Sequence, residues 1–234
     1  MVGFIRNLFM SLIEIKNLKK HYSSGDDVVE ALRGVDITIE AGEFITIMGQ
    51  SGSGKSTLLS VLGGMNHPTT GDVEMAGVKL YQLPGEKLAD FRAQNLGFVF
   101  QSFHLIQYLT AIENVMLPLA IVKMKGSEKI AAARRALERV GLGTKLDRLP
   151  NQLSGGEQER VAIARAIVNN PHILLADEPT GNLDSKTSEE VMALFRELND
   201  AGQTVVMVTH NPENGAYADR TIHLKDGMVV GVQA

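Results

Sequence analysis

The sequence predicts an α/β fold: a buried parallel sheet, joined by a separate antiparallel sheet and a helical insert. Two apolar runs, HILLAD (172–177) and TVVMVTH (204–210), are typical of parallel strands that are covered on both faces. LIEIK (12–16) and VDITIE (35–40) instead alternate apolar and polar residues, a pattern typical of half-buried strands in an antiparallel sheet. The region of about 103–160 looks different from both, because it is rich in helical patterns.

This region of about 103–160 is expected to form a helical subdomain inserted into a single domain that covers 12–234. One predicted helical face consists of four apolar residues at the required spacing: Ile130, Ala133, Leu137 and Val140. Gly141 follows this face and is a stop signal. Near the end of the sequence, Asp226-Gly227 lies between two β-prone runs and predicts a hairpin.

The composition narrows the function classes. The chain has 234 residues, enough to bury a sizeable core. Its net charge of −4 gives no general attraction for polyanions, so nucleic-acid binding is disfavoured. It has no cysteine, which excludes disulfides and thiolate chemistry and suits a reducing compartment. No apolar run reaches the roughly eighteen residues that a membrane span needs.

The first residues, MVGFIRNLFMSL, are apolar and lightly basic, and residues 1–11 form an extension ahead of the predicted domain. The segment is too short to span a membrane and lacks a small-residue cleavage site. Two interpretations stay open: a short amphipathic helix on a membrane surface, or a terminal extension that is disordered or docked on the domain.

A phosphate-binding loop is predicted at GQSGSGKST (49–57), which fits the pattern G-x-x-x-x-G-K-[ST]. The strand-like EFITIM precedes it and the helix-like TLLSVLGG follows it, a context that a simple Gly/Ser linker would lack. Glycines let backbone N–H groups point at phosphate oxygens, and the helix N-terminus adds its positive end. Lys55 is expected to reach the β- and γ-phosphates, and the Ser56 hydroxyl to ligate Mg²⁺. The residues expected to bind the nucleotide here are Gly49, Gln50, Ser51, Gly52, Ser53, Gly54, Lys55, Ser56 and Thr57.

Two acidic residues, Asp177 and Glu178, end the apolar run HILLADE. The end of a buried parallel strand is where open α/β sheets bind ligands. We expect Asp177 to orient Mg²⁺ and Glu178 to act as the general base that aligns or deprotonates the attacking water. The alternative is an ordinary acidic exit from a strand, which the phosphate-binding loop upstream makes the weaker interpretation.

A second glycine turn lies in NQLSGGEQERVAIARA (151–166). Ser154 and Glu157 form a capping box, so the simplest interpretation is a well-capped helix start. A cap alone does not require Gly155 and Gly156, because each glycine disfavours the helix by about 1 kcal/mol relative to alanine. Close approach of a phosphate to the backbone would account for both. We therefore expect this turn to cover the γ-phosphate of a nucleotide bound to a second copy of the chain, in a dimer that encloses each nucleotide between two subunits.

LSGGE (153–157) resembles the signature sequence of ATP-binding-cassette (ABC) ATPases, and the resemblance extends from about residue 12 to about residue 231. The order of the motifs also fits that family, whose fold has a P-loop NTPase (RecA-like) core. The resemblance implies that Tyr22 stacks on adenine, Gln101 senses Mg²⁺ and the attacking water, and His210 contacts the γ-phosphate. It also implies that GNLD (181–184) crosses the dimer interface. Seen singly, these residues have ordinary alternatives, namely an exposed tyrosine, a polar strand end and a structural histidine.

The cofactors implied are ATP and Mg²⁺, the metal being held by Ser56, Gln101 and Asp177, while Ser154, Gly155 and Gly156 contact the nucleotide. One departure from the family is Glu159 in the signature helix, at a position where its members usually have glutamine.

Four stretches resemble one ABC subgroup, which serves lipoprotein release (LolD), MacB-type export and FtsE-type cell-division complexes: GEFITIMGQSGSGKSTLL, GFVFQSFHL, TAIENVMLPL and LADEPTGNLD. The resemblance implies an ATPase that dimerises on ATP and drives an integral membrane permease from the cytoplasmic face of the inner membrane. The apolar stretch FQSFHLIQYLTAIENVMLPLA (100–120) is the expected docking region, although most of it is also needed for the insert's own core. The alternative is a soluble ABC ATPase that acts without a permease. A GTPase is disfavoured because the chain has no N-K-x-D stretch.

Overall fold

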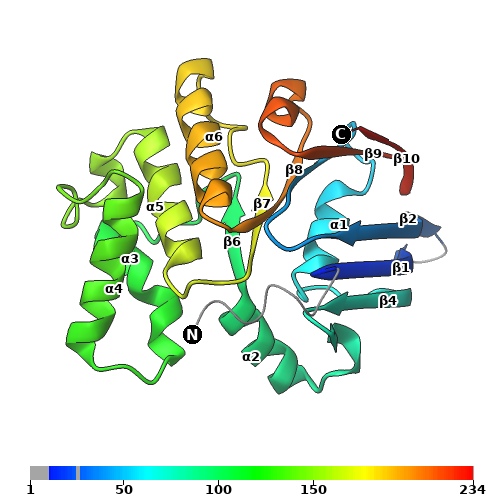
Figure 1. Ribbon diagram of the computed structural model, residues 1–234, viewed down its shortest axis with the longest axis horizontal. Helices are drawn as coiled ribbons and strands as arrows, with labels where there is room; N and C mark the ends of the chain where they lie inside the picture. The colour runs from blue at the N-terminus through cyan, green and yellow to red at the C-terminus, as the bar shows by residue number, and fades with distance from the viewer. Residues whose placement is uncertain (1–10, 25–26, 234) are drawn as a thin grey trace.

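The computed structural model describes residues 11–24 and 27–233 (Figure 1). The predicted extension over 1–11 therefore lies outside the described residues except for residue 11, as does the membrane-surface helix considered for it. The described chain contains one six-stranded and one four-stranded sheet with helices packed around them, which confirms the predicted α/β class.

The six-stranded sheet has the order β10-β9-β3-β8-β7-β6, and its pairs are parallel except for β9 with β10. Its strands are β3 (Phe44–Met48), β6 (Leu96–Phe100), β7 (Ile173–Asp177), β8 (Thr204–Thr209), β9 (Arg220–Lys225) and β10 (Met228–Gln233). Every residue of β3 and β8 is buried, as their continuous apolar sequences predict.

Each face of this sheet supports a separate hydrophobic core. In β7 and β8, Leu174, Ala176 and Met207 belong to one core, which also contains helical residues of the region of about 103–160. Ile173 and Val208 belong to the other core, which contains the antiparallel sheet. Because successive side chains of a strand point to opposite faces, a strand between two cores must be apolar throughout.

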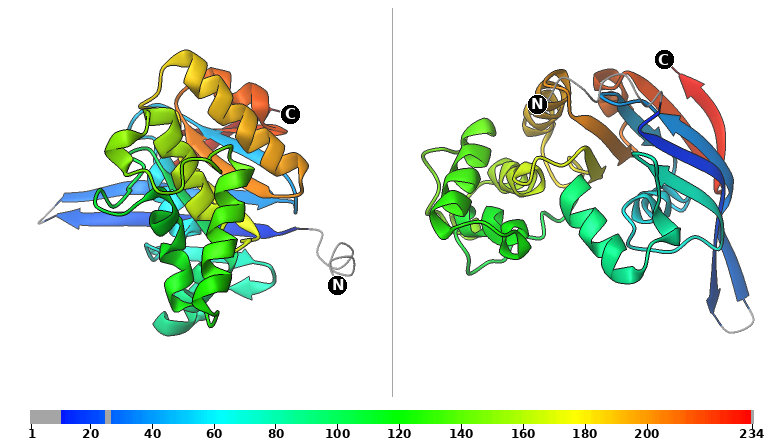
Figure 2. Two further views of the ribbon diagram at one scale, coloured as in Figure 1. Left: turned by 90° about the vertical axis from the view of Figure 1, so that its left-hand side faces the viewer. Right: turned by 60° about the horizontal axis from the view of Figure 1, so that its bottom comes forward.

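The four-stranded sheet is antiparallel with the order β2-β1-β4-β5. Its strands are β1 (Ile13–Ser24), β2 (Asp27–Ile39), β4 (Thr70–Met75) and β5 (Val78–Lys79). The β1–β2 hairpin extends well beyond the body of the protein (Figure 2). The burial of β2 alternates along its second half, so the predicted half-buried strands are confirmed.

The helices are α1 (Lys55–Leu62), α2 (Gly85–Asn95), α3 (Ala111–Met116), α4 (Gly126–Arg139), α5 (Gly155–Ile167) and α6 (Ser185–Asp200), and the 3₁₀ turns are η1 (Leu80–Gln82), η2 (Leu117–Ile121), η3 (Pro150–Gln152) and η4 (Pro212–Tyr217). Helices α3, α4 and α5 pack together at the end of the molecule opposite the antiparallel sheet (Figures 1 and 2). Three of the four residues predicted for one face of α4 are buried, whereas Ile130 is 46% exposed. Among the described helices, none is both long and apolar enough to span a membrane.

The predicted hairpin at Asp226-Gly227 joins β9 to β10, and both residues have positive φ, 48° and 76°. This turn also supports the phosphate-binding loop. The Gly227 N–H donates to the Ser53 carbonyl at 3.0 Å, and the Gly227 carbonyl accepts from the Arg33 N–H at 2.8 Å. A side chain at 227 would meet the Ala31 carbonyl at 2.8 Å, so glycine is required there.

Candidate active site

A cavity of about 970 Å³ lies where β3, β6, β7 and β8 end. Its walls come from β2, the phosphate-binding loop and the ends of these strands: Val29, Glu30, Ala31, Gly49, Gln50, Ser51, Gly52, Gly54, Lys55, Ser56, Thr57, Gln101, Asp177, Glu178, His210 and Pro212. The structure thus brings most of the sequence-predicted residues to one site. Ser53 is buried beneath the loop instead of lining the cavity.

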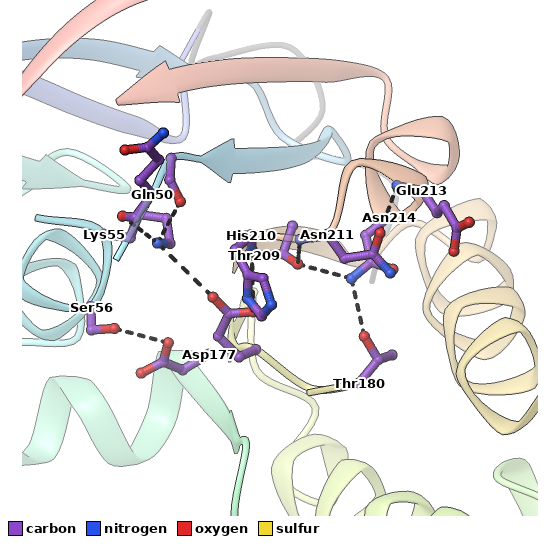
Figure 3. Close-up of polar contacts among 12 residues, drawn as sticks. Gln50, Lys55, Ser56, Asp177, Thr180, Thr209, His210, Asn211, Glu213 and Asn214 are labelled. Atoms are coloured by element: carbon purple, nitrogen blue, oxygen red, sulfur yellow. Dashed lines mark hydrogen bonds and ion pairs between the residues drawn. The ribbon is translucent and has the colours of Figure 1, made fainter. Parts of the chain in front are cut away.

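Lys55 is a nearly buried cation at the base of this cavity. Its Nζ donates to the Gly49 carbonyl at 2.8 Å and to the Gln50 carbonyl at 3.1 Å, and lies 4.0 Å from Glu178 Oε1 (Figure 3). An ammonium group has three N–H donors. Two of them hold the side chain in place, which leaves the third for an anion in the cavity.

The start of α1 is suited to bind that anion. Its N-cap, Gly54, has a φ of 102°, and a side chain there would meet the Ala31 carbonyl at 2.4 Å. A Cβ at Gly52 would have no atom within 4 Å, because this residue faces open space. In the described chain, no side chain caps α1 and no acidic residue lies in its first turn. No residue of the helix itself therefore neutralises its positive end, which faces Asp177 and Glu178 across the cavity.

Ser56, in the first turn of α1, and Asp177, at the end of β7, form an oxygen pair that lines the same cavity. The Ser56 hydroxyl donates to Asp177 Oδ1 at 3.2 Å (Figure 3). Burial raises the pKa of Asp177, the hydroxyl bond opposes this rise, and nearby Glu178 adds to it. A partly desolvated carboxylate beside a hydroxyl fits a hard cation such as Mg²⁺, which prefers oxygen ligands and takes several of them from water and phosphate.

Glu178 and His210 form a close pair at the ends of β7 and β8. Glu178 Oε2 lies 2.8 Å from His210 Nδ1 and accepts the His210 backbone N–H at 3.2 Å. The Glu178 side chain is only 13% exposed, whereas that of His210 is 64% exposed. Glu178 also has a φ of 49°, a left-handed conformation that a residue with a Cβ adopts at a free-energy cost.

Gln101, which follows β6, is held by the GNLD loop. A side chain at Gly181 would lie 2.6 Å from Gln101 Nε2, so these residues are in close contact. The Asn182 side chain donates to the Gln101 carbonyl at 2.9 Å. The family resemblance gave Gln101 and GNLD separate roles, but the structure links them directly.

Tyr22 does not line the cavity. Its hydroxyl accepts a hydrogen bond from Asn66 Nδ2 at 2.6 Å, and Lys20 Nζ lies 4.9 Å from its ring centroid. Its cross-strand partner Val29 lines the cavity instead, together with Glu30. The cavity-lining role of β2 was missed by the sequence analysis, because neither its residue types nor its spacing indicates a ligand.

The second glycine turn lies outside the cavity of its own chain. Its capping box is confirmed, with the Glu157 N–H donating to Ser154 Oγ at 3.3 Å and the Ser154 N–H to Glu157 Oε2 at 2.9 Å. The argument that both glycines await a ligand needs a correction. A Cβ at Gly156 would lie 2.2 Å from Thr187 Cγ2 in α6, so packing within the chain already requires this glycine. Of the two glycines, only Gly155 is not required by packing within the chain, because a Cβ there would come no closer than 3.3 Å to another atom, Leu183 Cδ2.

Glu159, the departure noted in the signature helix, is completely buried. Neither carboxyl oxygen has a hydrogen-bond partner among the described residues. Burial raises its pKa to about 9, and the charge of Arg165 opposes the rise. The side chain is therefore protonated at neutral pH.

A bound triphosphate needs N–H donors, a cation and a metal-holding oxygen pair. This cavity provides all three at the ends of β3 and β7, so the fold and the site together define a P-loop nucleoside triphosphatase.

Comparisons with known proteins give the particular family. A family model described as ABC transporter matches residues 32–181. The lipoprotein-releasing system ATP-binding protein LolD of Geobacter metallireducens is 50% identical, over 94% of this chain and 98% of that protein. The macrolide export ATP-binding/permease protein MacB of Rhodopirellula baltica is also 50% identical, over 93% of this chain, but the chain spans only 32% of MacB. The dimeric ATP-binding cassette MJ0796, solved in a post-hydrolysis state with ADP and Pi, has a TM-score of 0.86 and 46% identity over 94% of this chain and 97% of that one.

The chain belongs to the ABC transporter family. It is an ATP-binding cassette that hydrolyses ATP to ADP and phosphate.

Proposed function

We propose that this chain powers a membrane transporter of the lipoprotein-release or MacB-like export type, as a homodimer that closes around two ATP molecules. The observation that carries the proposal is the division of the site. Lys55, Ser56, Asp177, Glu178 and His210 converge on one cavity, whereas the signature turn lies outside it. A cassette divided in this way needs a second copy to complete the nucleotide site.

Within one subunit, Lys55 and the N-terminus of α1 bind the β- and γ-phosphates. Ser56, Asp177 and Gln101 hold Mg²⁺, which when bound neutralises charge that develops on the phosphates. His210 holds Glu178 Oε2 through its ring and its backbone N–H, so Oε1, which lies 4.0 Å from Lys55 Nζ, is the oxygen that accepts the proton of the attacking water. Because Glu178 is nearly buried, water reaches it mainly through the cavity.

Across the dimer, Ser154 and Gly155 cover the γ-phosphate of the partner's nucleotide. The dimeric form of the similar cassette MJ0796 supports this arrangement. The bond from Asn182 to Gln101 provides a route by which the predicted interface loop GNLD senses the Mg²⁺ site.

The helical subdomain, over about 103–160, carries the contact with an integral membrane permease at the cytoplasmic face. Tyr108 and Ile121, which are 81% and 74% exposed, support this proposal, since large apolar side chains exposed to water mark interaction surfaces. A second cavity of about 560 Å³ lies nearby, between α2, β6 and α5, and Ile121 lines it.

The alternative function is an ABC ATPase that acts without a permease. Co-purification of a membrane protein with the tagged chain distinguishes the two functions.

The dimer is tested with Glu178→Gln, which removes the general base and slows hydrolysis by about 10²- to 10⁴-fold. ATP should then hold two chains together, so that light scattering reports a doubled mass. Adding Gly155→Asp should abolish this dimer and leave ATP binding to the monomer intact.

Gly126→Asp is the matched control, because it puts the same charge at the exposed N-terminus of α4, where a Cβ meets no atom within 4 Å. Dimerisation of the Glu178→Gln/Gly155→Asp protein would contradict the proposal.

A further inference from the structure

A small polar cluster is buried beneath the loops that carry Glu178 and His210. It consists of Thr180, Thr209 and Asn214, which are 7%, 1% and 2% exposed. Asn214 Nδ2 donates to Thr180 Oγ1 at 3.1 Å and to Thr209 Oγ1 at 3.0 Å (Figure 3). A single amide group thus connects three separate segments of the chain.

The two threonines are close to the reacting residues in sequence. Thr180 follows Glu178 by two residues, and Thr209 directly precedes His210. Thr209 Oγ1 also accepts the Asn211 N–H at 3.1 Å, and the Asn211 side chain caps η4, which contains Asn214. Any displacement of Asn214 is therefore transmitted to both loops.

The backbone of Glu178 needs such support. Its left-handed φ of 49° persists only if the surrounding structure holds it. The Glu178 N–H donates to the Val208 carbonyl at 3.0 Å, and its carbonyl accepts the Gly181 N–H at 2.9 Å. These two bonds hold the Glu178 backbone at its N–H and at its carbonyl. The bond from Asn214 fixes Thr180, which lies between Glu178 and Gly181 in the sequence.

An asparagine suits this role better than an apolar residue of similar size. Both N–H bonds of its planar amide point to fixed acceptors, so the distance between the two threonine hydroxyls is set. An apolar side chain would fill the space but would let the loops move relative to each other, and a small misplacement of reacting groups can slow a reaction by about 100-fold.

We propose that Asn214 is a positioning residue for ATP hydrolysis, which aligns Glu178 with His210 through Thr180 and Thr209. This inference rests on the roles proposed above for Glu178 and His210.

Steady-state ATPase assays test it. Asn214→Leu should lower kcat by about 10-fold and change KM for Mg-ATP by less than about 2-fold, because the interaction matters in the transition state. In the Glu178→Gln background, adding Asn214→Leu should cause no further loss of kcat, since Asn214 acts through Glu178. Thr180→Val should lower kcat in the same way as Asn214→Leu, and Thr180→Ser, which keeps the hydroxyl acceptor, should restore most of the rate.

Asn199→Leu is the matched control. Asn199 is also buried and donates two hydrogen bonds, to the Gly42 and Gln203 carbonyls at 2.8 Å, but it lies away from the cavity. Its replacement should lower the melting temperature and spare kcat. The positioning role is overturned if both asparagine variants reduce kcat equally, if Asn214→Leu leaves kcat unchanged, or if its effect is undiminished in the Glu178→Gln background. Normal hydrolysis by Glu178→Gln alone would overturn the proposed function instead.

Discussion

Replacing Glu159 by glutamine is expected to stabilise the protein at neutral pH. The carboxyl group is completely buried in α5, and its pKa is raised to about 9 from the ordinary value of 4.5. Between these two values the folded protein holds a proton that the unfolded chain has released. The free energy of unfolding therefore falls by about 1.4 kcal/mol for each pH unit of increase across this window. At pH 7, about 2.5 units above the ordinary value, the loss is about 3 kcal/mol.

Glutamine has a similar shape and no proton to lose, so Glu159→Gln should recover about 3 kcal/mol at pH 7 and about 1 kcal/mol at pH 5.5. Urea unfolding at several pH values, followed by circular dichroism, measures the difference. A gain that does not grow as the pH rises from 5.5 to 8.5 would refute the reasoning.

Glu157→Gln is the control in the same helix. Hydrogen bonds from the Lys145 side chain and from the Ser154 N–H hold the pKa of Glu157 below its usual range. The ionised carboxylate therefore stabilises the folded protein at every pH above the pKa that a glutamate has in the unfolded chain. Its replacement should destabilise the protein at pH 7, and the effect should shrink as the pH falls through the pKa of the folded protein.

Three further predictions concern the nucleotide and the glycine turn. Lys55→Ala should abolish tight Mg-ATP binding, because its charge-assisted contact with phosphate is lost; unchanged affinity in calorimetry would remove Lys55 from that role. Tyr22 lies outside the cavity beside its cross-strand partner Val29, so its ring reaches adenine only if the base extends past Val29. Tyr22→Ala should then weaken ATP binding by about 1–3 kcal/mol and spare tripolyphosphate, because stacking acts on the base; equal losses for the two ligands would show that Tyr22 does not touch adenine. Gly156→Ala should destabilise the chain by about 1–3 kcal/mol through its contact with Thr187. Adding Thr187→Ser, which removes Cγ2, should restore the lost stability, and a melting curve without such rescue would contradict the assigned contact.

The parts of the site that the sequence predicts are those in which one short segment carries the chemistry. The phosphate-binding loop and the pair Asp177-Glu178 are of this kind, because the strand before each segment sets its place at the edge of the sheet. Other parts depend on packing between distant segments. The contact of Tyr22 with Asn66, the close approach of Gly156 to Thr187, and the bonds of Asn214 each join residues that no local pattern connects.

The same distinction applies to burial. The periodicity of α4 predicts an apolar face, but Ile130 is exposed while Ala133 and Leu137 are buried, because burial also depends on which neighbouring segments cover each residue. The capping box at Ser154 predicts where α5 begins. It does not predict that Glu159, in the same helix, is buried with no hydrogen-bond partner among the described residues.

The position of β3 has a consequence for the order in which the protein matures during synthesis. The strand that leads into the phosphate-binding loop lies between β8 and β9, and the turn after β9 bonds to Ser53 in that loop. Both neighbours follow the loop by more than a hundred residues, so β3 emerges from the ribosome long before the strands that pair with it. A growing chain that already contains the loop therefore has no supported nucleotide site, and ATP cannot stabilise it until the strands through β9 have been made.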